Sequence, residues 1–581
     1  MSLSLIYLIA FYLIYRVALV TLLPRLLLPL ASRLPASIAT PLDKHSFAGY
    51  NVPGGKGGLW AMWVKWDAVH YLRVARYGEA ATDAIAGGLT DHGGEDGDEK
   101  FGGVINWKED WPPDVIHDGY ESDGCARKEY SETMGAFYRG YPELIRSLSR
   151  KLSGGGGGLA DDDDGGAMSV PQHGTLPKHY IAGGLIVNNV SALLSLPLLH
   201  FLTSRTFPSD PRLAYYSSLI YIFNPAQIFF TNIGTEGLTF FLLLAFYIVH
   251  DYVHGSKRGE NGDAVFVRLS ALPFLLMFIY LSCSVRSTPC LVIFLYVLSC
   301  LASSLVSKKP SILGRPLAVA VSLAECAVAL LPSLEHNIAQ TIRLCSGTDN
   351  ERLVMEGGGI EGVCQGVSAQ VVKVLAGAAS GGWISYCKAA LQLPSIYRAI
   401  QRTYWDTGYF MSYYKLSNVP HFLIASPTFY LAGVGLAYWG KRMIDKVVKD
   451  GRGGGGVWVV QRVWDNLRLH VNENEDEKEG RRALLNDGSH LFCRGDMLKH
   501  VAVTLALMFV VGVFAHCQII TRVLCSHTPF FYWILASRLH FADQKGGAPR
   551  EHCCSLKFLH AYLVIFNVVG CALHISYLPW V

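Results

Sequence analysis

Long apolar runs are the feature that most constrains how this chain can fold. They recur from Leu3–Leu23 onward, and at roughly 18–20 residues each is long enough to cross a bilayer as an α-helix. Charged residues make up only 17% of the chain, whereas a soluble protein carries about 25%. A disordered chain, a disulfide scaffold and a cytosolic globular enzyme are thereby excluded. We predict an all-α polytopic membrane protein.

The runs predict about 8–11 transmembrane helices. The first run has no basic residue before it and no small-residue cleavage site after it, so we expect a retained helix and not a signal peptide. The further candidates lie at about 180–203, 212–230, 236–252, 268–285, 289–306, 316–333, 420–439, 499–517 and 556–577.

Lysine and arginine in the short loops predict the orientation. If the N-terminus is cytosolic, the short cytosolic loops carry the basic residues, whereas the opposite turn Thr231–Glu236 has none and the turn at Arg286 has one. The long segments 31–179, 334–419 and 518–555 are then predicted to lie on the non-cytosolic side.

Composition and spacing argue against several other features. Three tracts rich in Gly and acidic residues, at about 83–126, 154–166 and 453–480, are predicted to be solvated insertions without chemistry. The fourteen cysteines show no CxxC or Cys/His zinc-binding spacing, and most lie inside or beside apolar runs, where small buried side chains are expected. The net charge of +4 is too mild to indicate nucleic acid. No internal repeat is visible, which disfavours a transporter built on inverted repeats.

The first long segment carries an acid and a histidine on one predicted helix face. Asp67 and His70 are three residues apart and share a face of a helix over 64–76. Trp66 limits the hydration of Asp67, which raises the proton affinity of the acid and suits a general base. The alternative is an interfacial tryptophan beside a solvated acid and histidine. The apolar side of this helix is formed by Val64, Ala68 and Leu72.

Further charges lie at or within predicted span boundaries. Glu132 precedes the aromatic run Ala136–Pro142, Glu236 closes a tight turn, and Arg286 occupies a polar break between two spans. An acid at a membrane boundary invites a functional partner. Arg16 falls inside the first span, where the simplest expectation is that it snorkels toward a lipid headgroup.

Two later segments complete the polar pattern. Gln401 and Trp405 belong to one aromatic-polar stripe at helical spacing, which indicates either a sugar site or an interfacial amphipathic helix. Arg522 with His516 forms a cation cluster that could hold a phosphate diester. Acids, aromatics and a phosphate-binding arginine are all predicted on the same side of one membrane.

In this order the motifs resemble the GPI mannosyltransferase II (PIG-V type) family of dolichyl-phosphate-mannose-dependent mannosyltransferases. The resemblance departs from the family pattern at Glu79, Arg139 and Thr288. The matching segments are Trp66–Gly78, Glu132 through Pro142, Phe223–Glu236, Ile400–Pro427, His516–Trp533 and the closing Leu578-Pro579-Trp580.

The resemblance implies a single GT-C-type glycosyltransferase domain over 1–581 in the endoplasmic reticulum membrane, with luminal loops carrying the site. It implies transfer of the second, α-1,6-linked mannose from dolichyl phosphate mannose to a one-mannose GPI precursor. We expect no cofactor beyond this donor substrate, and the need for a small membrane accessory subunit is left open. Another lipid-linked mannosyltransferase, or a polytopic lipid transporter, are the alternatives.

The residue roles follow from reaction by single displacement. Asp67 is expected to be the general base, with Glu132 and His70 orienting hydroxyl groups. Arg522, together with His516, is expected to neutralise the leaving phosphate as a metal ion would elsewhere, so no obligatory metal is predicted. The substrate-binding candidates are Trp66, Glu236, Arg286, Gln401, Tyr404, Trp405, His516, Gln518 and Arg522.

Overall fold

Every regular element that the computed structural model describes is a helix, which confirms an all-α chain. Two helices that are long and apolar enough to cross a membrane are Lys178–Thr206 (α7) and Glu236–His254 (α10). Two more lie within Gly314–Cys345 (α14) and Val419–Lys449 (α19). The described residues are 3–22, 68, 71, 72, 75, 138–153, 178–254, 270–306, 314–345, 414, 419–449, 497–513, 517–544 and 550–575.

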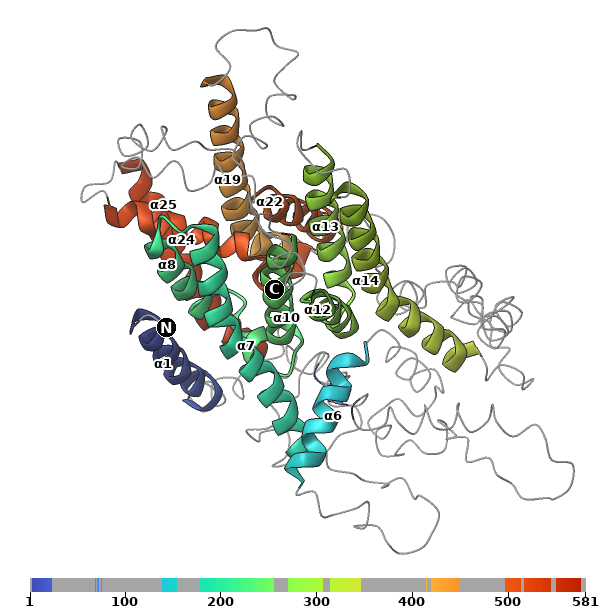
Figure 1. Ribbon diagram of the computed structural model, residues 1–581. Coiled ribbons are helices and arrows are strands. Elements are labelled where there is room, and N and C mark those ends of the chain that lie inside the picture. The colour runs from blue at the N-terminus through green and yellow to red at the C-terminus, as the bar shows by residue number, and fades with distance from the viewer. Residues whose placement is uncertain are drawn as a thin grey trace, which may run out of the picture.

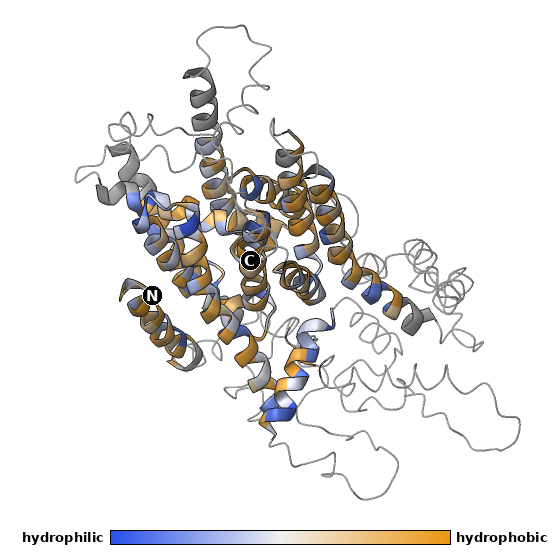
Figure 2. Cartoon of the chain, in the orientation of Figure 1, coloured by the Kyte–Doolittle hydropathy of each residue, from blue (hydrophilic) through white to orange (hydrophobic). Residues whose placement is uncertain are grey.

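Shorter apolar helices account for five more of the predicted spans. With the four longer ones they confirm nine predicted spans as apolar helices, and these helices lie side by side in one bundle (Figure 1). Figure 2 shows that apolar residues dominate their length. These five apolar stretches lie in Leu3–Val17 (α1), Leu272–Val285 (α12), Thr288–Val306 (α13), Met497–Ala506 (α22, continued by a π-helical stretch, Leu507–Val513) and Arg550–Ile575 (α25).

The predicted span 212–230 is wrong, because it divides into two helices. Pro211–Ile222 (α8) begins at Asp210, whose side chain accepts hydrogen bonds from the backbone of the first turn, as a helix cap does. It ends before Asn224-Pro225, where the proline disfavours helix in the preceding residue. A five-residue helix, Gln227–Thr231 (α9), follows the turn.

The long segment predicted at 518–555 contains two helices. Ile520–His527 (α23) and Pro529–Gln544 (α24) pack against other helices of the bundle. His540 on α24 pairs with Asp210 at the start of α8, with Nε2 3.0 Å from Oδ2. Polar residues at the α23–α24 junction and along α24 hide these helices from a hydropathy scan.

The N-terminal half of the bundle is organised around α7. This helix packs against α8, α10 and Gly140–Leu152 (α6). Asn188 on α7 joins it to α10, because its Oδ1 accepts from the backbone N of Gly237 at 2.8 Å. α6 lies beside one end of α7 and is the most hydrophilic of these helices in Figure 2. The first residue of α6, Gly140, meets Ser284 near the end of α12, so α6 lies at the end of the bundle that carries Arg286.

Candidate active site

Glu236 is the centre of a charged cluster at the N-terminus of α10. Its Oε1 accepts from Arg286 Nη1 at 2.6 Å and also from Arg522 Nε. The carboxylate is fully buried, whereas the side chains of Arg286 and Arg522 are 19% and 12% exposed. One acid with two guanidinium groups leaves one net positive charge near the surface. Such a cluster is suited to an anionic oxygen ligand.

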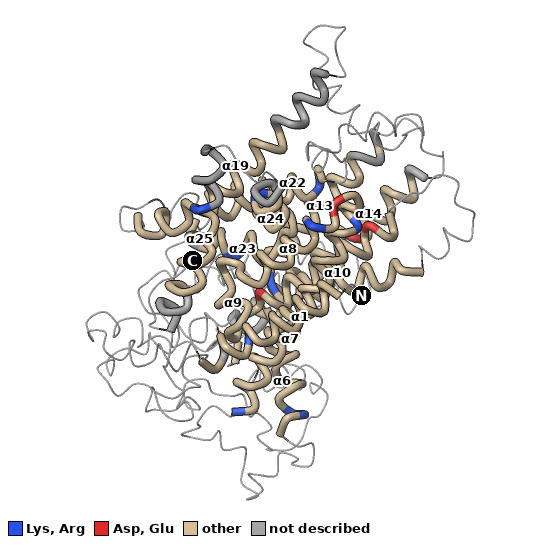
Figure 3. The backbone as a smooth tube through the Cα atoms, turned by 90° about the vertical axis from the view of Figure 1, so that its left-hand side faces the viewer, with Lys and Arg blue, Asp and Glu red and all other residues tan. Residues whose placement is uncertain are grey.

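Three elements far apart in the sequence deliver this cluster. Glu236 opens α10, Arg286 caps the end of α12 in an extended conformation, and Arg522 lies on α23. Arg522 Cζ also lies 4.5 Å from the centre of the Phe229 ring. Charged residues are sparse along the bundle, and one group of them lies near α9 in Figure 3. The structure thus brings together three of the residues that the sequence marked as substrate-binding candidates.

Space around the second oxygen of Glu236 is limited by Gly234. A Cβ atom built on Gly234 would lie 2.6 Å from Glu236 Oε2, so a side chain there would displace the acid. This oxygen is buried and accepts no hydrogen bond from the described residues. Buried carboxylate oxygens normally have a partner, so Glu236 Oε2 is a position for a hydroxyl group.

The turn before Glu236 is held from α7. Asn188 Nδ2 donates to the carbonyl oxygens of Phe229 and Asn232 at 2.9 and 2.7 Å. Asn189 Nδ2 donates to Thr231 O at 2.8 Å. Side-chain amides thus satisfy the backbone of an irregular segment inside an apolar bundle, where an unpaired carbonyl would be costly.

The expectation that Arg16 snorkels toward a headgroup is wrong. Its side chain is buried, and Nη1 donates to Phe230 O at 2.7 Å and to Thr231 Oγ1 at 2.5 Å. Nη2 donates to the hydroxyl of Tyr12. Arg16 therefore fastens α1 to the same turn that positions Glu236.

The segment around Tyr141, part of the matching segment Glu132 through Pro142, lies near the Glu236 cluster. Tyr141 is fully buried and its hydroxyl donates to Gly184 O at 3.2 Å. Gly140 meets the end of α12 so closely that a Cβ there would lie 2.8 Å from Ser284 O. Burial, and then the nearby Tyr71 and Glu236, raise the pKa of Tyr141 well above its usual value, so Tyr141 stays protonated and donates.

Four residues of the matching segment Trp66–Gly78 are described, and one of them, Tyr71, lies beside Tyr141. Tyr71 packs edge-on against the Tyr141 ring, with 5.0 Å between the ring centres. Arg146 Nε donates to Ala75 O at 2.5 Å. All of the described residues of this loop are helical and buried, which confirms a helix with an apolar face in this part of 64–76; they are Ala68, Tyr71, Leu72 and Ala75.

Most other candidates are not placed. Gln518 belongs to the 3₁₀ turn Cys517–Ile519, without a described side chain. The candidates that lie outside the described residues are Trp66, Asp67, His70, Glu132, Gln401, Tyr404, Trp405 and His516. The predicted insertions at 83–126, 154–166 and 453–480 also lie outside them.

His527 is a site-supporting residue that the sequence reasoning did not select. Its Nε2 is 2.7 Å from Thr288 Oγ1, and its Nδ1 is 2.8 Å from Ser526 Oγ. It thereby joins α23, which carries Arg522, to α13, which begins just after Arg286. The signal that could have found it is a histidine at a polar break inside an apolar stretch.

Comparison with known proteins gives a consistent family. Residues 179–581 match the family model described as Mannosyltransferase (PIG-V). GPI alpha-1,6-mannosyltransferase 2 of Mus musculus is 27% identical over 239 residues, which cover 36% of this chain and 42% of that protein. The Cricetulus griseus protein of the same name is 26% identical over 218 residues, covering 32% of this chain and 39% of that protein. The chain thus aligns with about two fifths of the length of these relatives.

A longer alignment exists with an insect relative. GPI mannosyltransferase 2 of Drosophila melanogaster is 24% identical over 482 residues, which cover 83% of this chain and 88% of that protein. Among solved structures, the Archaeoglobus fulgidus oligosaccharyltransferase gives a TM-score of 0.36 at 11% identity over 77% of this chain and 45% of its own.

Proposed function

The chain belongs to the mannosyltransferase (PIG-V) family, and from this premise we propose that it transfers the second mannose of the GPI anchor. The donor is dolichyl phosphate mannose, the acceptor is the precursor that carries one mannose, and the bond formed is α-1,6. The names of its relatives in mammals and in Drosophila support the acceptor and the linkage. The GT-C architecture is the one that this family implies for a helical membrane domain over 1–581.

The observation that carries the proposal is the pairing of Arg286 and Arg522 on Glu236. Dolichyl phosphate is a diester in the donor, so it has one negative charge to neutralise. The net positive charge of the cluster matches that requirement. Guanidinium groups bind phosphate oxygens with directional hydrogen bonds, and their stabilisation increases as charge develops on the leaving group.

Displacement of the phosphate requires one general base, and Asp67 is our candidate for it. Asp67 directly precedes Ala68, and Tyr71, one turn further along, packs against Tyr141, which lies near Glu236. The base takes the proton from the acceptor hydroxyl while the phosphate leaves from the opposite face of the sugar, with inversion. Glu236 Oε2, which is buried without a hydrogen-bond partner among the described residues, is our candidate acceptor for a substrate hydroxyl.

The remaining candidates are assigned by chemistry. Glu132 and His70 orient acceptor or donor hydroxyls, His516 and Gln518 assist at the phosphate, and Trp66 with the Gln401–Trp405 stripe contacts the sugar or lipid headgroup. The protein acts in the endoplasmic reticulum membrane with the Glu236 end toward the lumen, as the basic loops indicate.

Cells that lack the endogenous enzyme test the proposal. Such cells expressing this chain should convert the one-mannose GPI intermediate into the two-mannose form, measured by labelling the lipid intermediates with mannose. An inactive Arg522→Gln variant at equal abundance serves as the control. Persistence of the one-mannose species, or a two-mannose species accumulating on loss of the protein, contradicts the assignment and favours a different mannosyl acceptor.

A further inference from the structure

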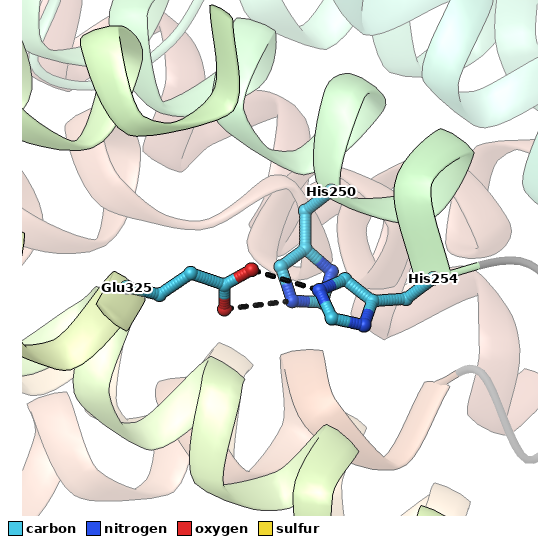
Figure 4. Close-up of side chains that lie close together, drawn as sticks. All are labelled: His250, His254 and Glu325. Atoms are coloured by element: carbon cyan, nitrogen blue, oxygen red, sulfur yellow. Dashed lines mark hydrogen bonds and ion pairs between the residues drawn. The ribbon is translucent and has the colours of Figure 1, made fainter. Parts of the chain in front are cut away.

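A second polar cluster lies toward the opposite end of α10. His250 and His254 are one helical turn apart on α10, and Glu325 reaches them from α14 (Figure 4). Glu325 Oε1 is 2.8 Å from His254 Nε2, and Glu325 Oε2 is 3.5 Å from His250 Nε2. One nitrogen of each ring and a carboxylate oxygen thus lie within 4.8 Å of one another.

The cluster is buried and its hydrogen bonding is incomplete. The side chains of His250 and Glu325 are 1% and 0% exposed, and that of His254 is 23% exposed. Neither ring nitrogen of His250 makes a hydrogen bond with the described residues, nor does Glu325 Oε2. Buried polar atoms of native proteins nearly always have a partner, so His250 Nε2 and Glu325 Oε2, which lie 3.5 Å apart without a hydrogen bond, indicate a missing ligand between them.

We propose that His250, His254 and Glu325 bind one Zn²⁺ ion between α10 and α14. Two imidazole nitrogens and one carboxylate oxygen form a common zinc ligand set, in which a fourth position is open to water. At Zn–N and Zn–O distances of about 2.0–2.2 Å, tetrahedral ligand atoms are roughly 3.3–3.5 Å apart. The 3.5 Å pair already has this separation, and the 2.8 Å pair requires a small opening.

The surroundings provide charge and orientation for the ion. Asp251 Oδ1 pairs with Lys499 and accepts from the Tyr296 hydroxyl at 2.8 Å, so these two charges compensate each other. The same oxygen is 4.0 Å from His250 Nδ1, where a carboxylate can fix the ring of a metal-binding histidine. Among the described residues, Glu325 has histidines as its only basic partners, and a divalent cation would compensate its charge.

The site is separate from the proposed active site. His250 lies about 21 Å along α10 from Glu236, at roughly 1.5 Å per residue. Zinc would therefore join α10 to α14 and hold α10, which carries Glu236, without touching the substrate. We expect its removal to lower the melting temperature of the whole protein.

Metal analysis of the purified full-length chain in detergent tests the proposal. The wild type should contain about one zinc per chain, and His254→Gln and Glu325→Gln should each lower zinc affinity at least about tenfold. The matched control is His560→Gln, which changes an exposed histidine on α25 and should keep its zinc. Added Zn²⁺, but not Mg²⁺, should raise the melting temperature of chelator-treated wild type and leave that of Glu325→Gln unchanged.

A second arm uses wild-type protein alone, because a substitution at a buried position can prevent folding. Chelator-treated wild type titrated with Co²⁺ should develop the intense visible absorption of tetrahedral Co²⁺ at about one equivalent, and Zn²⁺ should remove it. The proposal is wrong if the wild type binds neither ion, or if zinc content is the same in folded His254→Gln, Glu325→Gln and His560→Gln. Neutral, directly hydrogen-bonded side chains would then explain the cluster.

Discussion

Arg522 and Arg286 bind Glu236 through different atoms, and this separates their expected contributions. Arg286 donates through a terminal Nη1, whereas Arg522 donates through Nε. We expect Arg522 to bind the phosphate and Arg286 to hold Glu236.

Substitution of Arg522 should lower transfer without removing the protein. Arg522→Gln should lose about 10²–10³-fold in the rate of mannose transfer, because stabilisation of the leaving phosphate is lost. The transfer rate of Arg522→Lys should lie between those of the wild type and Arg522→Gln, because lysine keeps the positive charge but lacks the planar guanidinium group. Transfer assays in membranes at matched protein abundance measure this, with exposed Arg150→Gln as the control. A rate above about a tenth of wild type in Arg522→Gln would contradict the role.

Asp67 carries the chemical prediction. Asp67→Asn keeps the shape of the side chain and removes its ability to accept a proton, so transfer should fall about 10²–10⁴-fold at near-normal abundance. Glu132→Gln should be milder if Glu132 only positions a hydroxyl. The opposite ranking, with Asp67→Asn active and Glu132→Gln inactive, would move the base to Glu132. The same membrane assay gives both values.

The sequence predicts which residues belong to the candidate site wherever those residues lie in a recognisable motif. Glu236, Arg286 and Arg522 were all selected as substrate-binding candidates, and the structure joins them. Arg16 was misjudged because its acceptor, Phe230 O, is 214 residues away, and hydropathy carries no information about such a distant partner. A buried arginine is paired far more often than it is alone.

At the scale of elements, α1 depends on Arg16 for its place in the bundle. Arg16→Leu should release α1 from the turn at Phe230 and leave that carbonyl oxygen unsatisfied, at a cost of about 1–3 kcal/mol. We expect a lower melting temperature and reduced transfer. Ile14→Leu, a change at an exposed position of the same helix, should alter neither. Equal melting temperatures for Arg16→Leu and wild type would show that α1 is held by apolar packing.

Helix positions were predictable wherever apolar residues run without interruption. Nine of the ten predicted spans are apolar helices, because burial in a bilayer requires such a run. The prediction fails at α8–α9 and does not report α23 and α24, where polar side chains inside the bundle are satisfied by other helices. Trp533 shows why, since its indole donates to Thr203 Oγ1 on α7 at 2.8 Å and is fully buried. That partnership depends on a contact between segments 330 residues apart.

At the scale of the whole molecule, the link between α6 and α7 should tolerate shortening. Residues 154–166 fall between the end of α6 and the start of α7 and consist of Gly and Asp apart from Leu159 and Ala160. A chain that lacks them should still restore GPI-anchored proteins at the surface of cells without the endogenous enzyme. Failure at normal abundance, with a deletion in 453–480 as the comparison, would assign a function to the tract.

The Glu236 cluster and the His250 cluster, both described above, differ in how much of each could be predicted from the sequence. The Glu236 cluster joins three segments that each carry a motif, so its members were predictable although their contacts were not. The His250 cluster joins α10 to α14 and shows no cysteine spacing, and the sequence-based prediction of no metal site did not consider it. Contacts between helices, which single-sequence patterns do not report, define both centres.

The bond from Arg16 to Phe230 also sets an order of events during synthesis. The chain grows at about 5–20 residues per second, so the 214 residues between donor and acceptor take roughly 10–40 s to make. At the start of that interval the first helix enters the membrane with Tyr12, on the same helix, as the native hydrogen-bond partner that Arg16 already has. Its final docking must wait for α7, α8 and the turn after them. The first segment to be synthesised is thus among the later ones to reach its native position.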